Sequence, residues 1–273
     1  MLKYLAKYKL FILLNLLIIF IMPLCIIVIV SLSSRENLIE NTFSISNISL
    51  RNYAEILKEF PIIRWTLNTI FVAVLSVLGG LISSVSVAYA LTHFEWRFKK
   101  SVFLLICFTF LIPVQITTIS LYKIYAGIGW IPSFKALIVP FFLTDPISVL
   151  ILRQFLMQVP INLGQVARIE GVSEIKIFFK IILPLLRPAL IANGLLIFLG
   201  SWNDLYQPLL YTIENPNLWT LPIGLAQIQG IHNVNPNLTM AAAALFILPV
   251  IGIFLLMQRR LLTSFDFSST IVK

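Results

Sequence analysis

The sequence is short of charged residues. Asp, Glu, Lys and Arg make up only 11% of its 273 residues, whereas a typical soluble domain carries about 25%. Hydrophobic residues make up 59% of the chain. So few charged side chains cannot cover a soluble body of this size, which excludes a cytosolic globular enzyme and a disordered chain. The composition is that of a polytopic membrane protein.

Cysteine and histidine are scarce as well, with two of each. Cys25 and Cys107 lie within apolar runs, so we expect two buried thiols rather than a disulfide. No Cys/His cluster has the spacing of metal ligands, since His93 and His232 are the only histidines. The apolar runs hold no Ser/His, Glu-x-x-His or paired-Asp arrangement, which disfavours an intramembrane enzyme.

The sequence also lacks Gly-x-x-x-x-Gly-Lys-(Ser/Thr), the loop whose backbone cradles nucleotide phosphates. We therefore expect no cofactor bound by this chain and no ATP hydrolysis by it. Any ATP-driven process that involves this chain would need ATP and Mg held by a partner ATPase.

Six apolar runs are long enough to cross the hydrocarbon core, which takes about 20 residues. The sequence therefore predicts an all-α polytopic membrane protein with six transmembrane helices. The first run is too long and too bulky for a cleaved signal peptide, and Pro140, Asp145 and Pro146 interrupt the fourth. The runs are residues 10–31, 67–91, 102–121, 136–157, 188–210 and 240–257.

The distribution of Lys and Arg predicts the orientation of these helices. With the N-terminus inside the cell, the inner segments hold 14 of the 20 basic residues, and segment 211–239 holds none. We therefore expect both termini in the cytoplasm. The net charge of +9 then reports topology, and no nucleic-acid partner is expected, because the basic residues do not gather on a soluble face.

We expect three parts in the chain. Residues 1–66 form the first helix and an extracytoplasmic cap that carries a short surface helix near residues 52–58. Residues 67–260 form the main transmembrane domain, and residues 261–273 a cytoplasmic tail. Small residues at Gly79, Gly80 and positions 83–90 allow close backbone approach, which predicts that the second helix packs in the middle of a bundle.

Residues 158–184, which we call the elbow, do not have the composition of a simple loop. Two amphipathic helices are expected, with Gly171 placed to end the first. The second begins at Ser173 and ends at Pro184. Helical spacing predicts one face of the first helix from Leu163, Val166, Ala167 and Glu170, and the apolar face of the second from Ile175, Phe178, Phe179 and Ile182. Such a helix pair either inserts into a cleft of a partner protein or rests on the lipid surface.

Within the elbow, Gln165, Val166 and Ala167 are followed by three further residues and then Gly171, and the segment ends in Ile182-Leu183-Pro184. This arrangement resembles the EAA loop of binding-protein-dependent ABC importer permeases, whose pattern is Glu-Ala-Ala, three residues and Gly. Gln165 and Val166 depart from that pattern, and the other positions match it.

Residues 202–208, which read Trp-Asn-Asp-Leu-Tyr-Gln-Pro, resemble a stretch found in the carbohydrate-importer branch of that family. Residues 67–69 and 152–155 resemble the same branch at their expected places. The resemblance runs from about residue 60 to residue 260 and is to a permease of the second-subunit type.

The resemblance implies a type-I ABC importer-like bundle and a permease that forms half of a translocation path. It implies import of a sugar or a related polyol or glycerol-phosphate solute across the bacterial plasma (inner) membrane, in contact with membrane lipid. The implied partners are a second permease subunit, an ABC ATPase dimer and an extracytoplasmic solute-binding protein.

In this family the elbow couples the permease to the ATPase by inserting into a groove of that subunit. The resemblance carries this role to Gln165, Val166, Ala167, Glu170, Gly171 and Glu174. Gly171 would allow the tight turn between the two arms. Gln165 keeps the hydrogen bonding of the family Glu but loses its charge, which Glu170 or Glu174 can replace.

Candidates for the translocation path or gate are Trp202, Asn203 and Asp204 near the outer end of the fifth helix. Intramembrane ionisable groups are costly and point to function, and this trio offers polar acceptors and a ring for a sugar. The alternative is that Asn203 and Asp204 lock helix packing at the gate, with the partner permease making the main substrate contacts. Gln115 is a weaker path candidate, for which a packing hydrogen bond is the alternative, and Asp145 is assigned to the break in the fourth helix.

The main rival reading is a proton-coupled secondary transporter that uses Asp145 and Asp204 as proton carriers. It would need no partner ATPase, and its uptake would be abolished by uncouplers and indifferent to vanadate. A membrane scaffold or receptor that transports nothing is a third reading. The elbow and the absence of an internal repeat weigh against the secondary transporter.

Overall fold

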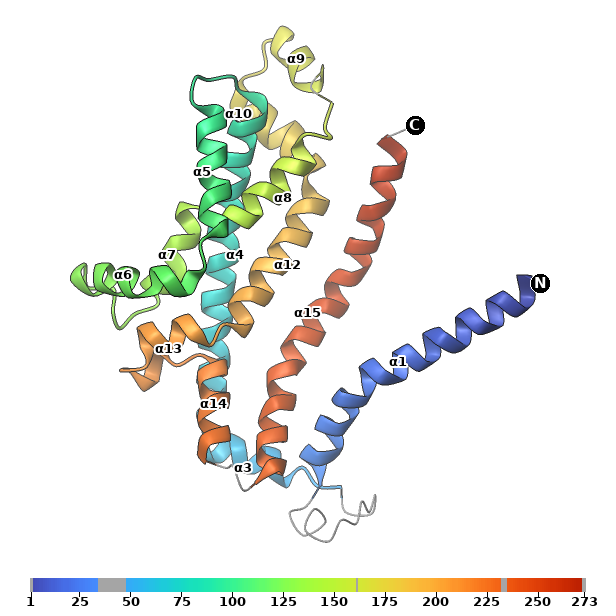
Figure 1. The fold of residues 1–273 in the computed structure, drawn as a ribbon, viewed down its shortest axis with the longest axis vertical. Coiled ribbons are helices and arrows are strands. Elements are labelled where there is room, and N and C mark those ends of the chain that lie inside the picture. Colours follow the sequence, from blue (N-terminus) through green and yellow to red (C-terminus); the bar gives the residue numbers. More distant parts are fainter. Residues whose placement is uncertain (1, 34–47, 161, 232–234, 272–273) are drawn as a thin grey trace. The chain divides into compact units, whose positions relative to one another are not determined.

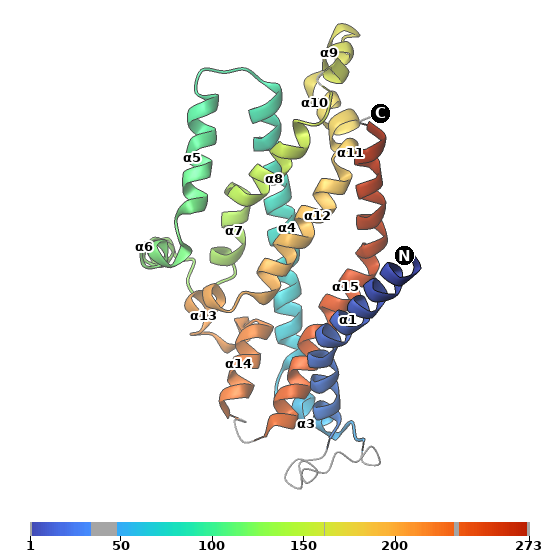
Figure 2. The same cartoon turned by 45° about the vertical axis from the view of Figure 1, so that its right-hand side comes forward.

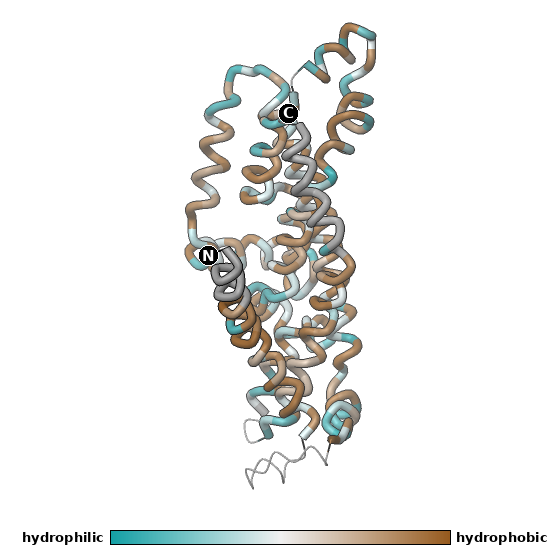
Figure 3. The backbone as a smooth tube through the Cα atoms, turned by 90° about the vertical axis from the view of Figure 1, so that its right-hand side faces the viewer, coloured by the Kyte–Doolittle hydropathy of each residue, from teal (hydrophilic) through white to brown (hydrophobic). Residues whose placement is uncertain are grey.

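The structure, a computed structural model, describes residues 2–33, 48–160, 162–231 and 235–271. The described residues form helices joined by turns and contain no strand. They fall into two compact units, one made of Met1–Trp65 with Leu221–Ile251 and the other of Thr66–Thr220 with Gly252–Lys273. Figure 3 shows hydrophobic residues along the lengths of the helices and hydrophilic ones in the turns between them.

The first unit holds α1 (Leu2–Leu32), α3 (Arg51–Glu59), α14 (Leu221–Ile231), and the beginnings of α4 (Ile62–His93) and α15 (Pro236–Ile271). Its stretch Phe11–Leu32 is apolar, and none of its hydrophobic window is buried within the chain. A helix that is apolar on all sides and lacks protein neighbours is suited to lipid contact. Cys25 and Cys107 are both free, as expected, but Cys25 is exposed on α1 rather than buried, because this helix has few protein neighbours.

The short helix expected near residues 52–58 is present as α3, and polar contacts hold it to the end of α1. Asn52 donates from its amide to the carbonyl oxygens of Ser31, at 2.7 Å, and Ser33, at 2.9 Å. The hydroxyl groups of Tyr53 and Ser31 lie 2.6 Å apart. These bonds satisfy carbonyl groups that the end of α1 leaves without a helical partner.

The second unit contains the remaining parts of α4 and α15 together with the following elements: α5 (Lys99–Leu111), α6 (Val114–Gly127), α7 (Lys135–Leu143), α8 (Pro146–Leu156), α9 (Asn162–Ile169), α10 (Glu174–Ile177), a π-helical turn (Phe178–Ile182), α11 (Leu183–Leu185), α12 (Arg187–Asn203), α13 (Tyr206–Thr212) and a 3-10 turn (Pro216–Leu218). Figures 1 and 2 show α4 running between α5 and α12.

Small residues let α4 pack closely in this unit, as the sequence predicts. A Cβ atom at Gly79 would overlap the ring of Phe142 on α7, and one at Gly80 would come within 2.8 Å of Ile197 on α12. Only glycine leaves room for neighbours at that distance. The second predicted helix therefore has partners on at least two sides.

The fourth apolar run is broken where the sequence predicts, between α7 and α8. The Asp145 side chain accepts hydrogen bonds from the backbone N–H of Ser148, at 3.3 Å, and from its hydroxyl, and so caps α8. On α4, the hydroxyl of Ser83 donates to the carbonyl of Phe141 at 2.8 Å and that of Ser84 to the carbonyl of Asp145 at 3.3 Å. Because lipid offers no hydrogen bonds to a free carbonyl, these serines make the break tolerable.

The third apolar run is not the single helix expected over residues 102–121. It consists of α5 and α6, which are bent by 100° relative to each other at Ile112 and Pro113. Proline has no N–H to continue a helix and disfavours helical geometry in the residue before it.

The fifth run ends earlier than predicted, with α12 stopping at Asn203 and α13 beginning at Tyr206. Pro208 has no N–H for the carbonyl of residue 204, which disfavours one helix running through both residues. Among the described residues, four helices are long and apolar enough to cross a membrane, or six if each of two bent pairs counts as one span. Both the count of six and the cytoplasmic termini remain predictions, as does the three-part division of the chain.

Candidate functional site

The first arm of the elbow ends in a Schellman motif centred on Gly171. The Val172 N–H donates to the carbonyl of Ala167 and the Gly171 N–H to that of Arg168, each at 3.0 Å. Gly171 has a φ of 78°, a left-handed conformation that favours glycine. Val172 packs against the core cluster to which the buried Ala167 belongs, in keeping with the apolar contact that usually accompanies this motif. The predicted helix stop at Gly171 is confirmed.

The second arm buries part of its predicted apolar face within the chain and leaves the rest exposed. Ile177 and Ile182 are fully buried, and they pack in a core cluster with side chains of α4, α8 and α12. Ile175 and Phe179, which belong to the predicted apolar face, are 72% and 59% exposed. The π-helical turn at Phe178–Ile182 has a wider repeat than an α-helix, which is consistent with Ile177 and Ile182, five residues apart, being buried together.

The elbow therefore presents an apolar surface. Its members are large hydrophobic side chains with exposed fractions between 43% and 86%, and we call them the elbow face: Leu163, Val166, Ile169, Ile175 and Phe179. Ile169, the most exposed of these at 86%, lies two residues before the turn at Gly171. Several large apolar side chains exposed on one short segment are typical of an interaction site.

The sequence-predicted coupling residues divide into three groups in the structure. Gln165, Val166, Glu170 and Gly171 are exposed. Ala167 is buried in the core cluster that joins the elbow to α4. Glu174 is half-exposed and faces other parts of this chain, so its carboxylate is already engaged.

We call Tyr89, Arg168 and Glu174 the clasp. Arg168 on α9 forms an ion pair with Glu174 through its Nε atom, and its second nitrogen donates to the other carboxylate oxygen at 3.3 Å. That oxygen also accepts from the Tyr89 hydroxyl of α4 at 3.2 Å. The hydrogen bond from Arg168 holds the pKa of the Glu174 carboxyl below its ordinary value. The clasp thus joins both arms of the elbow to α4.

Toward the other end of the α4 segment in this unit, a cavity of about 370 Å³ lies where α12 gives way to α13. It is lined mainly by residues of α4, α6, α7 and α12–α13. Of the predicted path residues, Gln115, Asn203 and Asp204 line it. None of its fourteen lining residues, all of them described, is basic.

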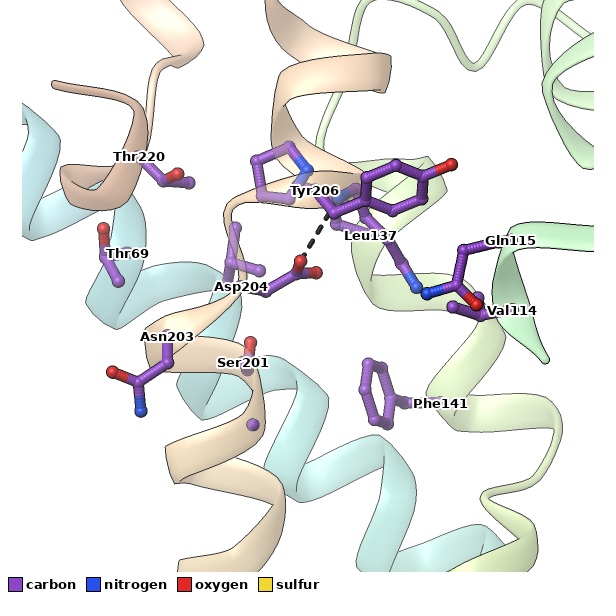
Figure 4. Close-up of a pocket in the computed structure, with 14 residues that line it drawn as sticks. Thr69, Val114, Gln115, Leu137, Phe141, Ser201, Asn203, Asp204, Tyr206 and Thr220 are labelled. Atoms are coloured by element: carbon purple, nitrogen blue, oxygen red, sulfur yellow. Dashed lines mark hydrogen bonds between the residues drawn. The ribbon is translucent and has the colours of Figure 1, made fainter. Parts of the chain in front are cut away.

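Asp204 is the one ionisable carboxylate of this cavity. One carboxylate oxygen accepts the N–H of Gln207 at 3.2 Å, which holds the side chain at the start of α13. Figure 4 shows the Asp204 carboxylate and the side chain of Gln115 directed toward the same space, with the Phe141 and Tyr206 rings beside it. Asn203 instead donates its amide back to the carbonyl of Leu199 at 2.8 Å.

Trp202, predicted as a ring for solute stacking, does not line the cavity. Its side chain is fully buried and stacks on Phe198, with ring centroids 5.5 Å apart. The rings that line the cavity are those of Phe141 and Tyr206. Tyr206 belongs to the same sequence stretch as Trp202, and only the helix break after Asn203 brings its ring to the cavity in place of the tryptophan.

Comparisons with known proteins agree on one family. The sequence profile described as "Binding-protein-dependent transport system inner membrane component" matches residues 80–265. The arabinooligosaccharides transport system permease protein AraQ of Halalkalibacterium halodurans is 31% identical over 244 residues, 88% of this chain and 87% of that protein. The trehalose/maltose transport system permease protein MalG of Thermococcus litoralis is 30% identical over 249 residues, covering 89% and 88%.

A third relative, the sn-glycerol-3-phosphate transport system permease protein UgpE of Pectobacterium atrosepticum, is 30% identical over 195 residues, 71% of this chain and 69% of that protein. Among solved structures, one chain of a bacterial ABC transporter involved in the import of the acidic polysaccharide alginate matches with a TM-score of 0.77. The match covers 93% of this chain and 97% of that chain at 20% identity, which shows a shared fold.

Proposed function

Because the chain belongs to the family of binding-protein-dependent transport system inner membrane components, we propose that it forms half of the path of an ATP-driven importer for a neutral, polyhydroxylated solute. Membership makes it a multi-pass permease of the bacterial plasma membrane. In the proposal, a second permease supplies the other half of the path. A separate ATPase dimer binds ATP and Mg, and an extracytoplasmic binding protein delivers the solute.

The observation that carries the coupling part of the proposal is the elbow face. Ile169 and Val166 of the first arm and Ile175 of the second are each more than half exposed. Burial in a groove of the ATPase would remove these side chains from water, which is the main favourable contribution to such an interface. Gln165 and Glu170, which are exposed beside them, suit the polar rim of the groove.

Position 165 is Gln in this chain, where the family pattern has Glu. The clasp limits which nearby carboxylate can replace the charge of that Glu. Glu174 already accepts hydrogen bonds from Arg168 and Tyr89. Glu170 is exposed and directly follows Ile169 of the elbow face in the sequence. We therefore assign a charged contact with the ATPase to Glu170 and an internal role to Glu174.

The solute class follows from the side chains at the cavity. The relatives named above are, by their names, permeases for arabinooligosaccharides, trehalose/maltose and sn-glycerol-3-phosphate, the last of which is an anion. The cavity offers hydroxyl, amide and carboxylate groups and two rings, but no basic side chain among its lining residues. A phosphate needs a cation or several N–H donors, whereas a neutral sugar needs acceptors and ring faces. These side chains favour a neutral sugar or polyol.

A proton-coupled mechanism has less support, because both of its proposed proton carriers act as helix caps. Asp145 accepts from Ser148 at the start of α8, and Asp204 accepts from the Gln207 N–H.

The coupling role is tested by Ile169→Asp in the complex of both permeases with the ATPase. A charge in the buried centre of an interface is expected to lower the amount of ATPase that co-purifies per permease by about tenfold or more, since loss of an anchor side chain costs about 2 kcal/mol or more. The matched control is Leu50→Asp, at an apolar residue that is 70% exposed outside the elbow. Equal ATPase recovery with Ile169→Asp and with Leu50→Asp would refute the proposal.

A further inference from the structure

We infer that the clasp makes α4 the lever that carries movement of the elbow to the cavity. The inference rests on the proposed coupling function of the elbow and names the residues that transmit its movement. Tyr89 is a positioning residue in this account. It touches neither ATPase nor solute, and it acts by joining Glu174 to α4.

At the elbow end, three separate elements meet at one carboxylate. Glu174 on α10 receives hydrogen bonds from Arg168 on α9 and from Tyr89 on α4. An arginine–carboxylate pair with two contacts fixes orientation as well as distance. The two arms and the helix behind them are therefore held as one body.

The α4 end of the clasp is anchored in packed aromatic side chains. Tyr89 is only 6% exposed, and its ring lies 4.4 Å from that of His93, 5.0 Å from that of Phe178 and 5.5 Å from that of Phe94. A close-packed cluster transmits displacement because it has no free volume to absorb it. A displacement of Glu174 is therefore transmitted through Tyr89 to the backbone of α4.

At its other end in this unit, α4 reaches the cavity, which Thr69 and Val72 line. The helix runs without a break from Ile62 to His93, so about 20 residues between Thr69 and Tyr89 span about 30 Å at 1.5 Å per residue. Between these ends, Gly79 and Gly80 pack closely against α7 and α12. Displacement of α4 therefore changes the cavity wall directly and through these neighbours.

The ion pair itself is half-exposed, and such pairs contribute little to folding. The clasp variants are therefore expected to fold and assemble, and to change the link between ATP hydrolysis and transport. A merely structural role would change stability and assembly instead.

The test compares Tyr89→Phe with the unaltered chain in proteoliposomes that hold both permeases and the ATPase, with binding protein and solute supplied. We expect assembly and ATP hydrolysis to be retained. The amount of solute transported per ATP hydrolysed is expected to fall about fivefold or more, which corresponds to the lower end of typical coupling free energies. Arg168→Glu is expected to lower this ratio, and Arg168→Glu combined with Glu174→Arg to restore it. An unchanged ratio in Tyr89→Phe, or no restoration in the double variant, overturns the inference.

A second measurement does not depend on turnover. In a chain with Cys25 and Cys107 replaced by Ser, Thr69→Cys at the cavity is expected to change its rate of labelling by a thiol reagent when ATP is added. Adding Tyr89→Phe is expected to remove that change, and its persistence overturns the inference. The proposed function fails separately, when Ile169→Asp leaves ATPase recovery unaltered.

Discussion

At the scale of single residues, Gly171 shows how a local requirement can be predicted from sequence. Its φ of 78° would cost any residue with a side chain about 1–2 kcal/mol. A Cβ atom there would have no neighbour within 4 Å, so the backbone conformation alone demands glycine. The position of a glycine after an amphipathic stretch carries this information, because the turn depends only on residues close in sequence.

Trp202 and Tyr206 show the opposite case, in which the sequence does not reveal which of two rings lines the cavity. Which of Trp202 and Tyr206 reaches the cavity depends on where α12 ends, and that end is set by Pro208 and by the hydrogen bond between Asp204 and Gln207. Residue spacing on an unbroken helix does not show which of the two rings lines the cavity. Asp204 and Gln115, which line it, are noticed from the sequence because they are polar residues within apolar runs, and their role in a path stays a prediction.

Asp204→Asn is expected to weaken discrimination against anionic solutes. The amide oxygen of Asn can still accept from the Gln207 N–H, so the start of α13 is kept, while the charge that repels an anion is removed. We expect the inhibition of uptake by an anionic sugar, relative to inhibition by its neutral analogue, to rise about tenfold, equivalent to about 1.4 kcal/mol.

The measurement is competition for uptake in proteoliposomes, with Thr220→Ser as the control at another cavity residue. An anion-to-neutral ratio that stays the same in Asp204→Asn would assign solute contact to the partner permease instead.

At the scale of elements, apolar length and prolines predict most helices but not their bends or register. The runs that became α1, α4 and the α7–α8 pair were predicted because each is long and apolar. The 100° bend between α5 and α6 has a visible signal in Pro113, but its angle depends on tertiary packing. The π-helical turn at Phe178–Ile182 has no local sequence signal, so the burial of Ile177 together with Ile182 could not be predicted from α-helical spacing.

The close packing of α4 gives a matched pair of glycine variants. Gly→Ala within a helix is favourable by roughly 0.5–1 kcal/mol when there is space for the methyl group. Gly252→Ala on α15 meets nothing within 4 Å, whereas Gly79→Ala would overlap the ring of Phe142. We expect Gly252→Ala to keep or raise the thermal unfolding temperature, and Gly79→Ala to lower it, since overpacking costs about 1–3 kcal/mol.

Thermal unfolding of the purified permease in detergent distinguishes the two variants. A Gly79→Ala protein as stable as Gly252→Ala would show that the ring of Phe142 can turn aside without loss.

At the scale of the whole molecule, the sequence is that of one subunit of a transporter rather than of a transporter that hydrolyses ATP itself. It has no phosphate-binding loop of the Gly-x-x-x-x-Gly-Lys-(Ser/Thr) type, and its family name refers to a transport system that depends on a binding protein. The orientation of the chain in the membrane is predicted from the excess of Lys and Arg in the segments assigned to the cytoplasmic side.

Uptake by the assembled complex is expected to depend on ATP and not on a proton gradient. In proteoliposomes, vanadate should abolish solute uptake, and a protonophore should leave it unchanged. Uptake that resists vanadate and is abolished by the protonophore would favour the secondary transporter. The control is ATP hydrolysis measured in the same vesicles, which vanadate must stop and the protonophore must not.

Ser83 and Ser84 also bear on how the chain is made. They donate to carbonyl groups at the break between α7 and α8, and Lys135–Leu156 has the lowest mean hydropathy, 1.8, of the four unbent candidate spans. Synthesis proceeds from the N-terminus, so α4 is available in the bilayer before this weaker segment leaves the ribosome. The donors that the broken segment needs are thus in place when it arrives, and reversing that order during biogenesis would expose its free carbonyl groups to lipid.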